Sequence, residues 1–340
     1  MSTYRALEVT GAHQFRLTNR ELVDPQPGMV RIRVEACGVC HTDVLAAEGM
    51  RADPSSPIVP GHEIAGAIDA VGAGVRAWHV GDRAGVGFLG GHCGECQPCR
   101  RGDFVNCLDQ PQMGTTVDGG YAEVVYTRAS GLARIPDGLS ALDAAPLLCA
   151  GLTTFRALQQ AGGSPGMLVA VQGLGGLGHL AVQYARHFGF RVAVIARGTA
   201  KAALARELGA SHYIDSSAGD PGAALRALGG AAAIIATAAS GASMSPLVAG
   251  LAPNGRLLVV GAAPDPISVG TADLIFGTRT ITGSLTGSAI DNEDNLAYCL
   301  ANNVRSMNEV LPWAEAPKAY ARMLSGEARF RVVLDMTASA

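Results

Sequence analysis

Short apolar runs broken by glycine and proline make up the first 150 residues of the chain. Their lengths and spacing predict strands at residues 30–36, 63–71, 83–87 and 121–126. Short strands between Gly and Pro turns are typical of an irregular, barrel-like β domain, which we expect over residues 1–150.

The pattern changes after Cys149, where unbroken apolar runs alternate with segments of helical spacing. Residues 167–172 and 190–196 are apolar without alternation, as in strands buried on both faces. The segment between them repeats apolar side chains at helical spacing, at Leu177, Leu180, Ala181, Tyr184 and Phe188. Further predicted elements are a helix at 201–208 that ends at Gly209, and strands at 232–237, 256–261 and 280–284, with helical stretches between the first two.

Strands that alternate with helices favour an α/β fold with a doubly wound parallel sheet, which we expect over residues 151–286. Residues 287–340 contain one predicted helix, 291–302, and one predicted strand, 331–334. These are too few elements for a separate domain, so we expect this segment to return to the N-terminal domain. A length of 340 residues also suits two domains.

Charge and hydropathy argue against several functions. The net charge is −3 and no basic block occurs, which argues against nucleic-acid binding. The longest apolar run, residues 231–239, is far shorter than the ~20 residues of a membrane span. The N-terminus has no basic region followed by an apolar run. We therefore expect a cytoplasmic protein with no membrane or nucleic-acid partner.

A glycine-rich turn follows the strand predicted at 167–172 and opens the next helix. It runs from Gly173 through Gly175, Gly176 and Leu177 to Gly178 and fits G-x-G-x-x-G, which in this context predicts a dinucleotide site. The first glycine permits the tight turn, the second lets the backbone approach a pyrophosphate, and the last allows close packing of helix on strand. The helix N-terminus offers free N–H groups to the phosphates. A turn that binds no ligand is the alternative.

The second strand of this domain ends at Ala196, where NAD-binding proteins often carry an acid for the ribose 2′-hydroxyl. Arg197 follows, and Lys201 is near. A carboxylate would repel a 2′-phosphate, whereas an arginine pairs with it, so the sequence favours NADP over NAD. The alternative is that Arg197 is solvated or stacks on the adenine.

Four of the eight cysteines form one compact run: Cys93, Cys96, Cys99 and Cys107. Close thiolates in a Gly-rich loop can enclose one tetrahedral zinc and leave no position for substrate, so we expect a structural lobe at about residues 90–110. Disulfides are less favoured, because a long chain without an export signal favours reduced thiols. An iron–sulfur cluster is also less favoured, because the fourth cysteine comes later than in the bacterial ferredoxin run and no proline follows it.

Three scattered residues are candidates for a second, open metal site: Cys40, His62 and Cys149. Their spacing alone does not separate ligands from core residues, since a lone buried Cys or His is more often core. Their neighbours strengthen the case, because His62 lies in a Pro-Gly-His-Glu segment and His-Thr-Asp follows Cys40.

Taken together, these stretches resemble the zinc-dependent alcohol dehydrogenases of the medium-chain dehydrogenase/reductase superfamily. The matching segments are 37–43, 61–63, the four-cysteine lobe, 148–153 and the glycine-rich turn, with a weaker match at 281–287, so that the resemblance covers essentially the whole chain. It implies a GroES-like catalytic domain followed by a Rossmann domain. It also implies reversible hydride transfer between a small alcohol or aldehyde and NAD(P).

The resemblance implies a role for each matching residue of the open site. Cys40, His62 and Cys149 correspond to the ligands of a catalytic zinc, the Cys2His set known from alcohol dehydrogenases. Together with the structural zinc, this implies two zinc ions per chain. Asp43 corresponds to the carboxylate that orients His62, and Glu63 to a residue behind the metal.

Contacts to the cofactor and to the reacting proton are implied in the same way. Thr42 corresponds to the hydroxyl that takes the alcohol proton, and His41 to a cofactor-phosphate contact. Thr153 corresponds to a nicotinamide contact and Arg331 to a pyrophosphate contact. Some relatives end the proton relay at a histidine where this chain has Leu45, so we expect proton release through water or His41.

The chemistry and the substrate follow from the same resemblance. Zinc acts as a Lewis acid on the alcohol oxygen, and hydride passes between the alcohol carbon and nicotinamide C4. Phe88 aligns with an aromatic pocket wall, and residues 48–54 contain no Trp or Phe. We therefore expect a roomy pocket for primary, allylic or benzylic alcohols and their aldehydes. Cys37 and Cys299 are expected to bind no metal.

Two other functions are considered. One is reduction of another polarised bond, such as an enone or imine, on the same scaffold; the other is a non-catalytic, nucleotide-sensing zinc protein. Retention of all three open-site ligands argues against both, and Thr42 argues further against the second. Relatives form dimers and tetramers, so we expect a homo-oligomer.

Overall fold

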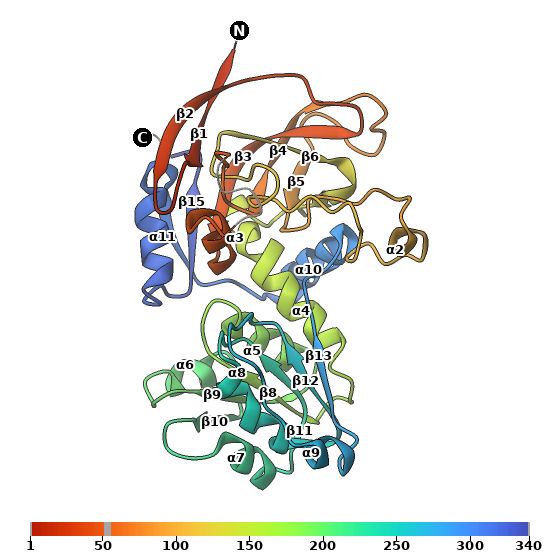
Figure 1. Ribbon diagram of the computed structural model, residues 1–340, viewed down its shortest axis with the longest axis vertical. Helices are drawn as coiled ribbons and strands as arrows, with labels where there is room; N and C mark the ends of the chain where they lie inside the picture. The colour runs from red at the N-terminus through yellow and green to blue at the C-terminus, as the bar shows by residue number, and fades with distance from the viewer. Residues whose placement is uncertain (1, 51–55, 339–340) are drawn as a thin grey trace. The chain divides into compact units, whose positions relative to one another are not determined.

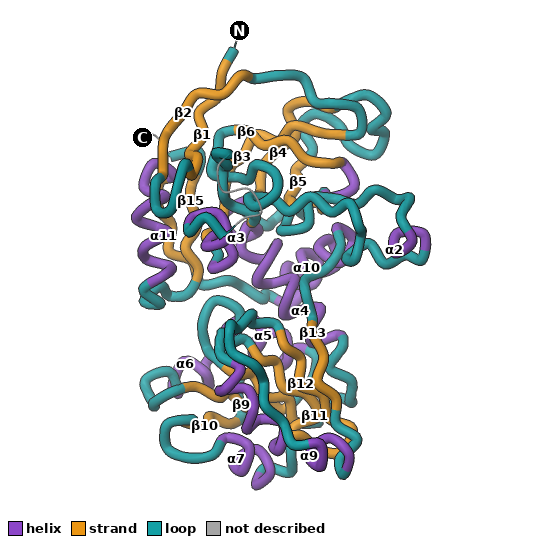
Figure 2. The backbone as a smooth tube through the Cα atoms, viewed as in Figure 1, coloured by secondary structure: helices purple, strands orange, loops and turns teal. Residues whose placement is uncertain are grey.

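The computed structural model describes residues 2–50 and 56–338. The chain forms two compact units, one made of Met1–Cys149 with Gly287–Ala340 and the other of Ala150–Thr286. Figure 1 follows the chain through both units, and Figure 2 separates their strands from their helices.

The first unit is built on a seven-stranded sheet with the order β14-β15-β3-β4-β5-β7, in which β6 also pairs with β3. β14 and β15 run parallel, and the other pairs are antiparallel. The strands are β3 (Met29–Val39), β4 (Glu63–Val71), β5 (Arg83–Val86), β6 (Val124–Arg128), β7 (Ala133–Arg134), β14 (Asn308–Pro312) and β15 (Arg331–Asp335). Because β15 pairs with β3, the C-terminal segment completes the sheet of this unit.

An antiparallel hairpin and several short helices surround this sheet. The hairpin joins β1 (Thr3–Val9) to β2 (Phe15–Glu21). The helices are α1 (Val44–Ala47), α2 (Gln97–Arg100), α3 (Ala141–Pro146), α10 (Ala289–Asn302) and α11 (Ala316–Leu324), with the 3-10 turns η1 (His41–Asp43), η2 (Ala129–Gly131) and η5 (Trp313–Glu315). Ile32, Ile64, Ile68, Tyr121 and Trp313 are among the buried core residues. Each such side chain contributes about 1.5–3 kcal/mol to folding.

The second unit contains a six-stranded sheet with the order β10-β9-β8-β11-β12-β13, in which every pair is parallel. The strands are β8 (Leu168–Gln172), β9 (Arg191–Ala196), β10 (His212–Asp215), β11 (Ala231–Ala236), β12 (Leu251–Val259) and β13 (Thr280–Gly283). The helices are α4 (Leu152–Gln159), α5 (Gly178–His187), α6 (Ala202–Glu207), α7 (Pro221–Ala227), α8 (Gly241–Met244) and α9 (Thr271–Ile275), with the 3-10 turn η4 (Ser245–Gly250).

In chain order this sheet has the 3-2-1-4-5-6 arrangement of doubly wound dinucleotide-binding domains. The strand order reverses between β8 and β11, and ligands bind at such a switch point, beyond the carboxyl ends of the strands. The predicted α/β fold is confirmed.

Several predicted elements differ from the observed ones for identifiable reasons. β6 begins at Val124 rather than at 121, because residues 119–121 hydrogen-bond to the segment that precedes His62. β10 is a short, partly exposed edge strand with polar ends, and the sequence analysis does not predict it. Cys149 lies within a continuous helical stretch rather than at its start, in the π-helical turn η3 (Leu147–Gly151) between α3 and α4.

One helical stretch among the described residues, Ala141–Gln159, has the length and apolar composition of a membrane span. However, 72% of its apolar window is buried inside the protein. A buried core helix passes the same test, so this stretch is weak evidence for a membrane.

Candidate active site and metal centres

Two strands and the π-helical turn η3 bring four side chains that could bind a metal ion together in the first unit. Cys40 follows the end of β3, Glu63 begins β4, and the pairing of Gly38 with Glu63 places these two strand ends side by side. Cys149 comes from η3, and π-helical turns of this kind occur frequently at functional sites. The ligand atoms of Cys40, His62, Glu63 and Cys149 all lie within 4.8 Å of one another.

The two ring nitrogens of His62 have different environments. Nδ1 lies 3.0 Å from Oδ1 of Asp43, in a hydrogen bond between two buried side chains. Nε2 is buried and has no hydrogen-bond partner among residues 2–50 and 56–338. The carboxylate holds the proton on Nδ1, so the lone pair of Nε2 is available to a metal ion. An unpaired buried nitrogen is costly, and a metal ion would satisfy it.

The two thiols of this cluster influence each other's ionisation. A hydrogen bond from Cys149 holds the pKa of Cys40 well below its usual range, against the effect of burial. The same contact, together with burial, raises the pKa of Cys149 well above its usual range. Without a cation the pair therefore carries one thiolate, and ligation by both sulfurs requires the positive charge of a metal.

Glu63 and Arg331 form a buried ion pair behind the cluster. Nη2 of Arg331 donates to Oε1 of Glu63 and, at 3.1 Å, to the carbonyl of Val39. Oε2 of Glu63 has no partner among the described side chains. Burial raises the pKa of Glu63 to about 7, against the attraction of Arg331. The structure thus places Arg331, predicted to contact a pyrophosphate, in a buried contact with Glu63; the pyrophosphate contact stays a prediction.

Helix α10 holds the turn that carries Cys149. Asn292 Nδ2 donates to the carbonyl of Leu148 at 3.2 Å, and Asn295 Nδ2 to that of Leu147 at 2.9 Å. These carbonyls precede Cys149, and both asparagines are buried. This contact joins residues nearly 150 positions apart, so no local pattern in the sequence predicts it.

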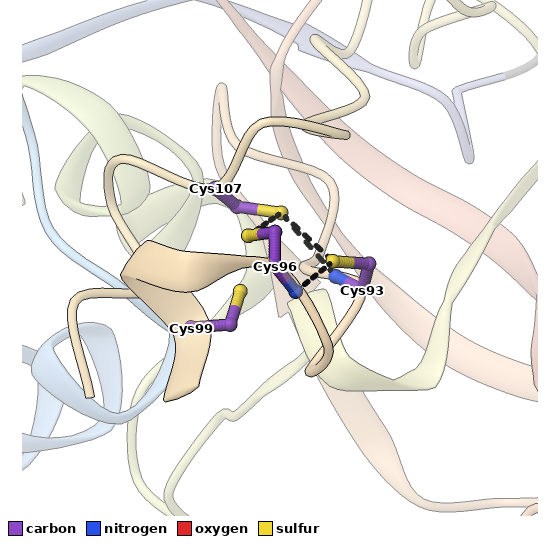
Figure 3. Close-up of side chains that lie close together, drawn as sticks. All are labelled: Cys93, Cys96, Cys99 and Cys107. Carbon is purple, nitrogen blue, oxygen red and sulfur yellow. Dashed lines mark hydrogen bonds between the residues drawn. The ribbon is translucent and has the colours of Figure 1, made fainter. Parts of the chain in front are cut away.

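The four-cysteine lobe has the geometry of a closed metal site. Figure 3 shows the side chains of Cys93, Cys96, Cys99 and Cys107 converging, with Cys99 carried by α2. The Sγ atom of Cys107 lies 3.6 Å from that of Cys93 and 3.9 Å from that of Cys96. Four sulfurs bound tetrahedrally at about 2.3 Å from zinc would lie about 3.8 Å apart. All eight cysteines are free thiols.

Backbone amides around the lobe stabilise sulfur in its ionised form. The N–H of Leu108 donates to Sγ of Cys96 at 3.5 Å, and this contact with others lowers the pKa of Cys96 to about 6. Burial and the neighbouring sulfur of Cys96 raise the pKa of Cys99 to about 12. Ionisation of Cys99 at neutral pH therefore requires a nearby cation, such as a bound metal ion. Among the described residues, Cys37 and Cys299 belong to neither cluster.

The glycine-rich turn lines a pocket of about 640 Å³ in the second unit, where the sequence predicts a dinucleotide site. Gly173 has φ +90°, and a Cβ at Gly178 would lie 1.8 Å from the carbonyl oxygen of Gly173. A Cβ at Gly175 would meet nothing within 4 Å, so its backbone is open to a ligand. The first and last glycines therefore shape the turn, and the middle one leaves room for a phosphate. Gly176 and Leu177 complete the lining of the turn.

The cationic residues predicted to favour NADP also line this pocket. Ala196, Arg197 and Lys201 lie at its β9 edge, and Arg197 is exposed. Lys201 Nζ donates to the carbonyl of Leu174 at 2.8 Å, which ties it to the glycine-rich turn. On the neighbouring strand, Oδ1 of Asp215 accepts from the N–H of Gly198 at 2.8 Å and holds the residue after Arg197.

The remaining predicted site residues occupy varied environments. Thr42 is half-buried, with Oγ1 3.8 Å from Sγ of Cys40, and His41 is exposed. Thr153 is buried on α4. The ring of Phe88 meets the His62 ring edge-on, with centroids 5.5 Å apart. The segment predicted to lack a bulky aromatic, 48–54, lies partly outside the described residues.

Comparisons with known proteins identify the family. Residues 26–137 match the family model "Alcohol dehydrogenase GroES-like domain" and residues 176–302 match "Zinc-binding dehydrogenase". The chain is 43% identical over 325 residues to alcohol dehydrogenase notN of Aspergillus sp. (strain MF297-2), covering 95% of each chain. Solved structures with similar folds include a cinnamyl alcohol dehydrogenase of Sorghum bicolor (TM-score 0.89, 32% identity, 100% and 99% coverage). Another is the CAD of Helicobacter pylori complexed with NADP(H) (TM-score 0.88, 27% identity, 99% coverage of each chain).

The fold and the two cysteine clusters define a zinc-type medium-chain dehydrogenase/reductase. Within that superfamily the chain belongs to the alcohol dehydrogenases. It is an oxidoreductase that acts on small-molecule alcohols with a nicotinamide cofactor, and the predicted family and enzyme class are confirmed.

Proposed function

We propose that this alcohol dehydrogenase holds two zinc ions and interconverts primary alcohols, including allylic and benzylic ones, with their aldehydes, with NADP(H) preferred over NAD(H). Cys40, His62 and Cys149 hold the catalytic zinc, and Cys93, Cys96, Cys99 and Cys107 hold the structural one. The observation that carries the proposal is the convergence of Cys40, His62 and Cys149, whose ligand atoms lie within 4.8 Å of one another, with Nε2 of His62 buried and without a hydrogen-bond partner among the described residues. Three protein ligands leave one position for substrate, as catalytic zinc requires.

The chain's own residues prepare this site for alcohol chemistry. When bound, zinc supplies a Lewis acid that lowers the pKa of an alcohol, and the nicotinamide supplies the hydride acceptor. Asp43 keeps the proton on Nδ1 of His62, so that Nε2 stays directed at the metal position. Oγ1 of Thr42, next to Cys40, accepts the alcohol proton. Leu45 cannot continue a relay, so the proton leaves through water or the exposed His41.

Glu63 contributes a second carboxylate behind the ligands. Arg331 holds one of its oxygens, and the other has no partner among the described residues. This free oxygen lies within reach of the ligand cluster, since Glu63 belongs to the group of atoms within 4.8 Å. If zinc is bound, this oxygen would be available as a temporary ligand during the exchange of one alcohol for another.

The NADP preference is supported by charge at the end of β9. Ala196 offers no carboxylate to the ribose 2′-hydroxyl, while Arg197 and Lys201 line the pocket. Arginine pairs with a 2′-phosphate through two parallel hydrogen bonds. The Helicobacter pylori neighbour, complexed with NADP(H), agrees with this proposal.

The substrate class is supported by one aromatic wall and by the relatives. The ring of Phe88 packs edge-on against His62, next to the metal position, where it can face an apolar substrate. The Sorghum bicolor neighbour is named for cinnamyl alcohol, which is both primary and allylic. We also propose a homodimer or homotetramer, which light scattering on the purified chain would test.

Metal analysis with a ligand variant tests the catalytic assignment. We expect about two zinc ions per chain in the native protein and about one in Cys149→Ala, with kcat for alcohol oxidation reduced about a thousandfold or more because several kcal/mol of Lewis-acid stabilisation are lost. The matched control is Cys299→Ser, which replaces a buried thiol outside both clusters, keeps a donor to Oδ1 of Asn295 and should keep two zinc ions. Undiminished alcohol oxidation by Cys149→Ala would contradict the assignment.

A further inference from the structure

We propose that Tyr121 is a positioning residue of the catalytic metal site: its hydroxyl fixes the Asp43 carboxylate, which in turn fixes the His62 ring. The inference rests on the proposed function of the Cys40, His62 and Cys149 cluster. No sequence motif for metal binding includes Tyr121, and the sequence analysis placed it only in a predicted strand.

A continuous chain of buried hydrogen bonds connects Tyr121 to the metal position. Tyr121 Oη donates to Oδ2 of Asp43 at 3.0 Å, and Oδ1 of the same carboxylate lies 3.0 Å from Nδ1 of His62. The backbone N–H of Cys40 donates to Oδ2 at 2.9 Å. Tyr121, Asp43 and His62 are exposed by 0%, 2% and 1%. Each carboxylate oxygen therefore has a fixed partner, and water does not compete for them.

The backbone around Tyr121 is tied to the residues just before His62. The bracing segment, which we define as Asp118–Tyr121, runs beside Val59–Gly61. The N–H of Gly119 donates to Val59 O at 2.7 Å, that of Gly120 to Gly61 O at 2.9 Å, and that of Tyr121 to Pro60 O at 3.0 Å. Oδ1 of Asp118 accepts from the N–H of Val59 at 2.9 Å. The segment that carries the tyrosine is thus bonded to the segment that carries the histidine ligand.

The two glycines of the bracing segment are required because a side chain at either position would clash with its neighbours. A Cβ at Gly119 would lie 2.0 Å from the carbonyl oxygen of Gly61, and one at Gly120 would lie 2.6 Å from Cγ1 of Ile64. Only glycine lets the segment approach this closely. On the other side, a Cβ at Gly61 would lie 2.4 Å from the Tyr121 ring, so the ring packs directly on the backbone next to His62.

The hydroxyl of Tyr121, unlike its ring, holds the Asp43 carboxylate in place by a hydrogen bond. Without the hydroxyl, Oδ2 of Asp43 keeps only the N–H of Cys40, and a buried carboxylate that loses one of its donors holds Nδ1 of His62 less firmly. Burial and the charge of Asp43 raise the pKa of Tyr121 well above its usual range, so the hydroxyl remains a hydrogen-bond donor. Outer contacts that orient a ligand histidine are worth about 10–100-fold in metal affinity, and we expect about tenfold here because Tyr121 acts through Asp43.

Zinc release from Tyr121→Phe tests the inference, because this variant keeps the ring and removes only the hydroxyl. The full chain, loaded with zinc, is mixed with a colorimetric chelator, and release from the two sites is followed in time. We expect release from the catalytic site to be about tenfold faster than in the native protein, and release from the four-cysteine site to be unchanged. The control is Tyr126→Phe, which removes a hydroxyl bonded to the backbone of Val23 and should change neither rate.

A double-mutant cycle with Asp43→Asn separates positioning from general stability. If Tyr121 acts through Asp43, Tyr121→Phe should speed zinc release no further in the Asp43→Asn background. Additive effects of the two substitutions would overturn the inference. So would a Tyr121→Phe chain that releases zinc at the native rate, even if its metal-free form melted at a lower temperature. A native chain that binds no zinc at the cluster of Cys40, His62 and Cys149 would instead refute the proposed function and the inference together.

Discussion

At the scale of single residues, we expect Arg197 to determine which cofactor the second unit binds best. It is exposed at the edge of the dinucleotide pocket, and Ala196 before it carries no acid. Losing a charge-assisted hydrogen bond to a 2′-phosphate costs about 1.5–3 kcal/mol. We therefore expect Arg197→Ala to lower kcat/KM for NADPH about 10–100-fold and to leave kcat/KM for NADH nearly unchanged.

Steady-state kinetics with both cofactors measure this preference. Arg206→Ala is the matched control, since it removes an exposed arginine from the next helix without touching the pocket lining. Ala196→Asp should move the preference towards NADH, because it places a carboxylate where the 2′-phosphate would bind. A native chain that already prefers NADH would refute the role given to Arg197.

Single residues also show where sequence reasoning ends. The four-cysteine lobe could be predicted because its members lie within 15 positions, and close spacing specifies a shared site. The cluster of Cys40, His62 and Cys149 could be predicted only by resemblance, because a fold must first bring three distant residues together. The Glu63–Arg331 pair and the Tyr121 hydroxyl contact were missed, since each is a long-range contact with no local pattern.

At the scale of elements, the β1–β2 hairpin depends on one buried carboxylate. Glu8 accepts from Arg16 Nη2 at 2.6 Å and from Arg20 Nη2 at 2.9 Å. Burial opposes ionisation, but these arginines hold the pKa of Glu8 below its usual 4.5. Its stabilising effect is therefore fully present above pH 4.5 and is lost as the pH falls through the lower, folded-state pKa.

We expect Glu8→Gln to reduce the free energy of unfolding by about 1.5–3 kcal/mol at neutral pH, because charge-assisted hydrogen bonds are lost. The difference from the native protein should shrink below pH 4.5, where Glu8 itself becomes protonated. Urea unfolding at a series of pH values measures this. Glu21→Gln, at the exposed end of β2, is the control and should behave like the native chain at every pH. A difference that persists in acid would contradict the prediction.

Elements with a strong local pattern could be predicted, and elements set by tertiary contacts could not. The strand expected at 63–71 is β4 with the same bounds, because its residues are apolar enough to be buried in any pairing. β10 was missed because His212–Asp215 is a short edge strand whose position depends on β9. The π-helical turn that carries Cys149 was also missed, since the asparagines that hold its carbonyls come from α10.

At the scale of the whole molecule, the two units contain different ligand sites, and this separation predicts how each ligand stabilises the chain. Both proposed zinc sites consist of residues of the first unit, and the glycine-rich pocket consists of residues of the second. A ligand that binds only the folded state stabilises the part that it binds, by about 2.7 kcal/mol at a concentration one hundred times its Kd.

Removal of zinc by a chelator should therefore increase hydrogen exchange mainly in the first unit, around β3, β4 and the cysteine lobe, because structural zinc supplies folding energy to the segment it closes. Saturation with NADPH should protect mainly β8, β9 and the glycine-rich turn. Peptide-resolved hydrogen exchange on the full chain measures both effects, with Arg197→Ala as the control that should weaken only the NADPH protection. If chelation instead accelerated exchange in β8 and β11 as much as in β3 and β4, the two units would open together. Stability could then not be assigned to each site separately.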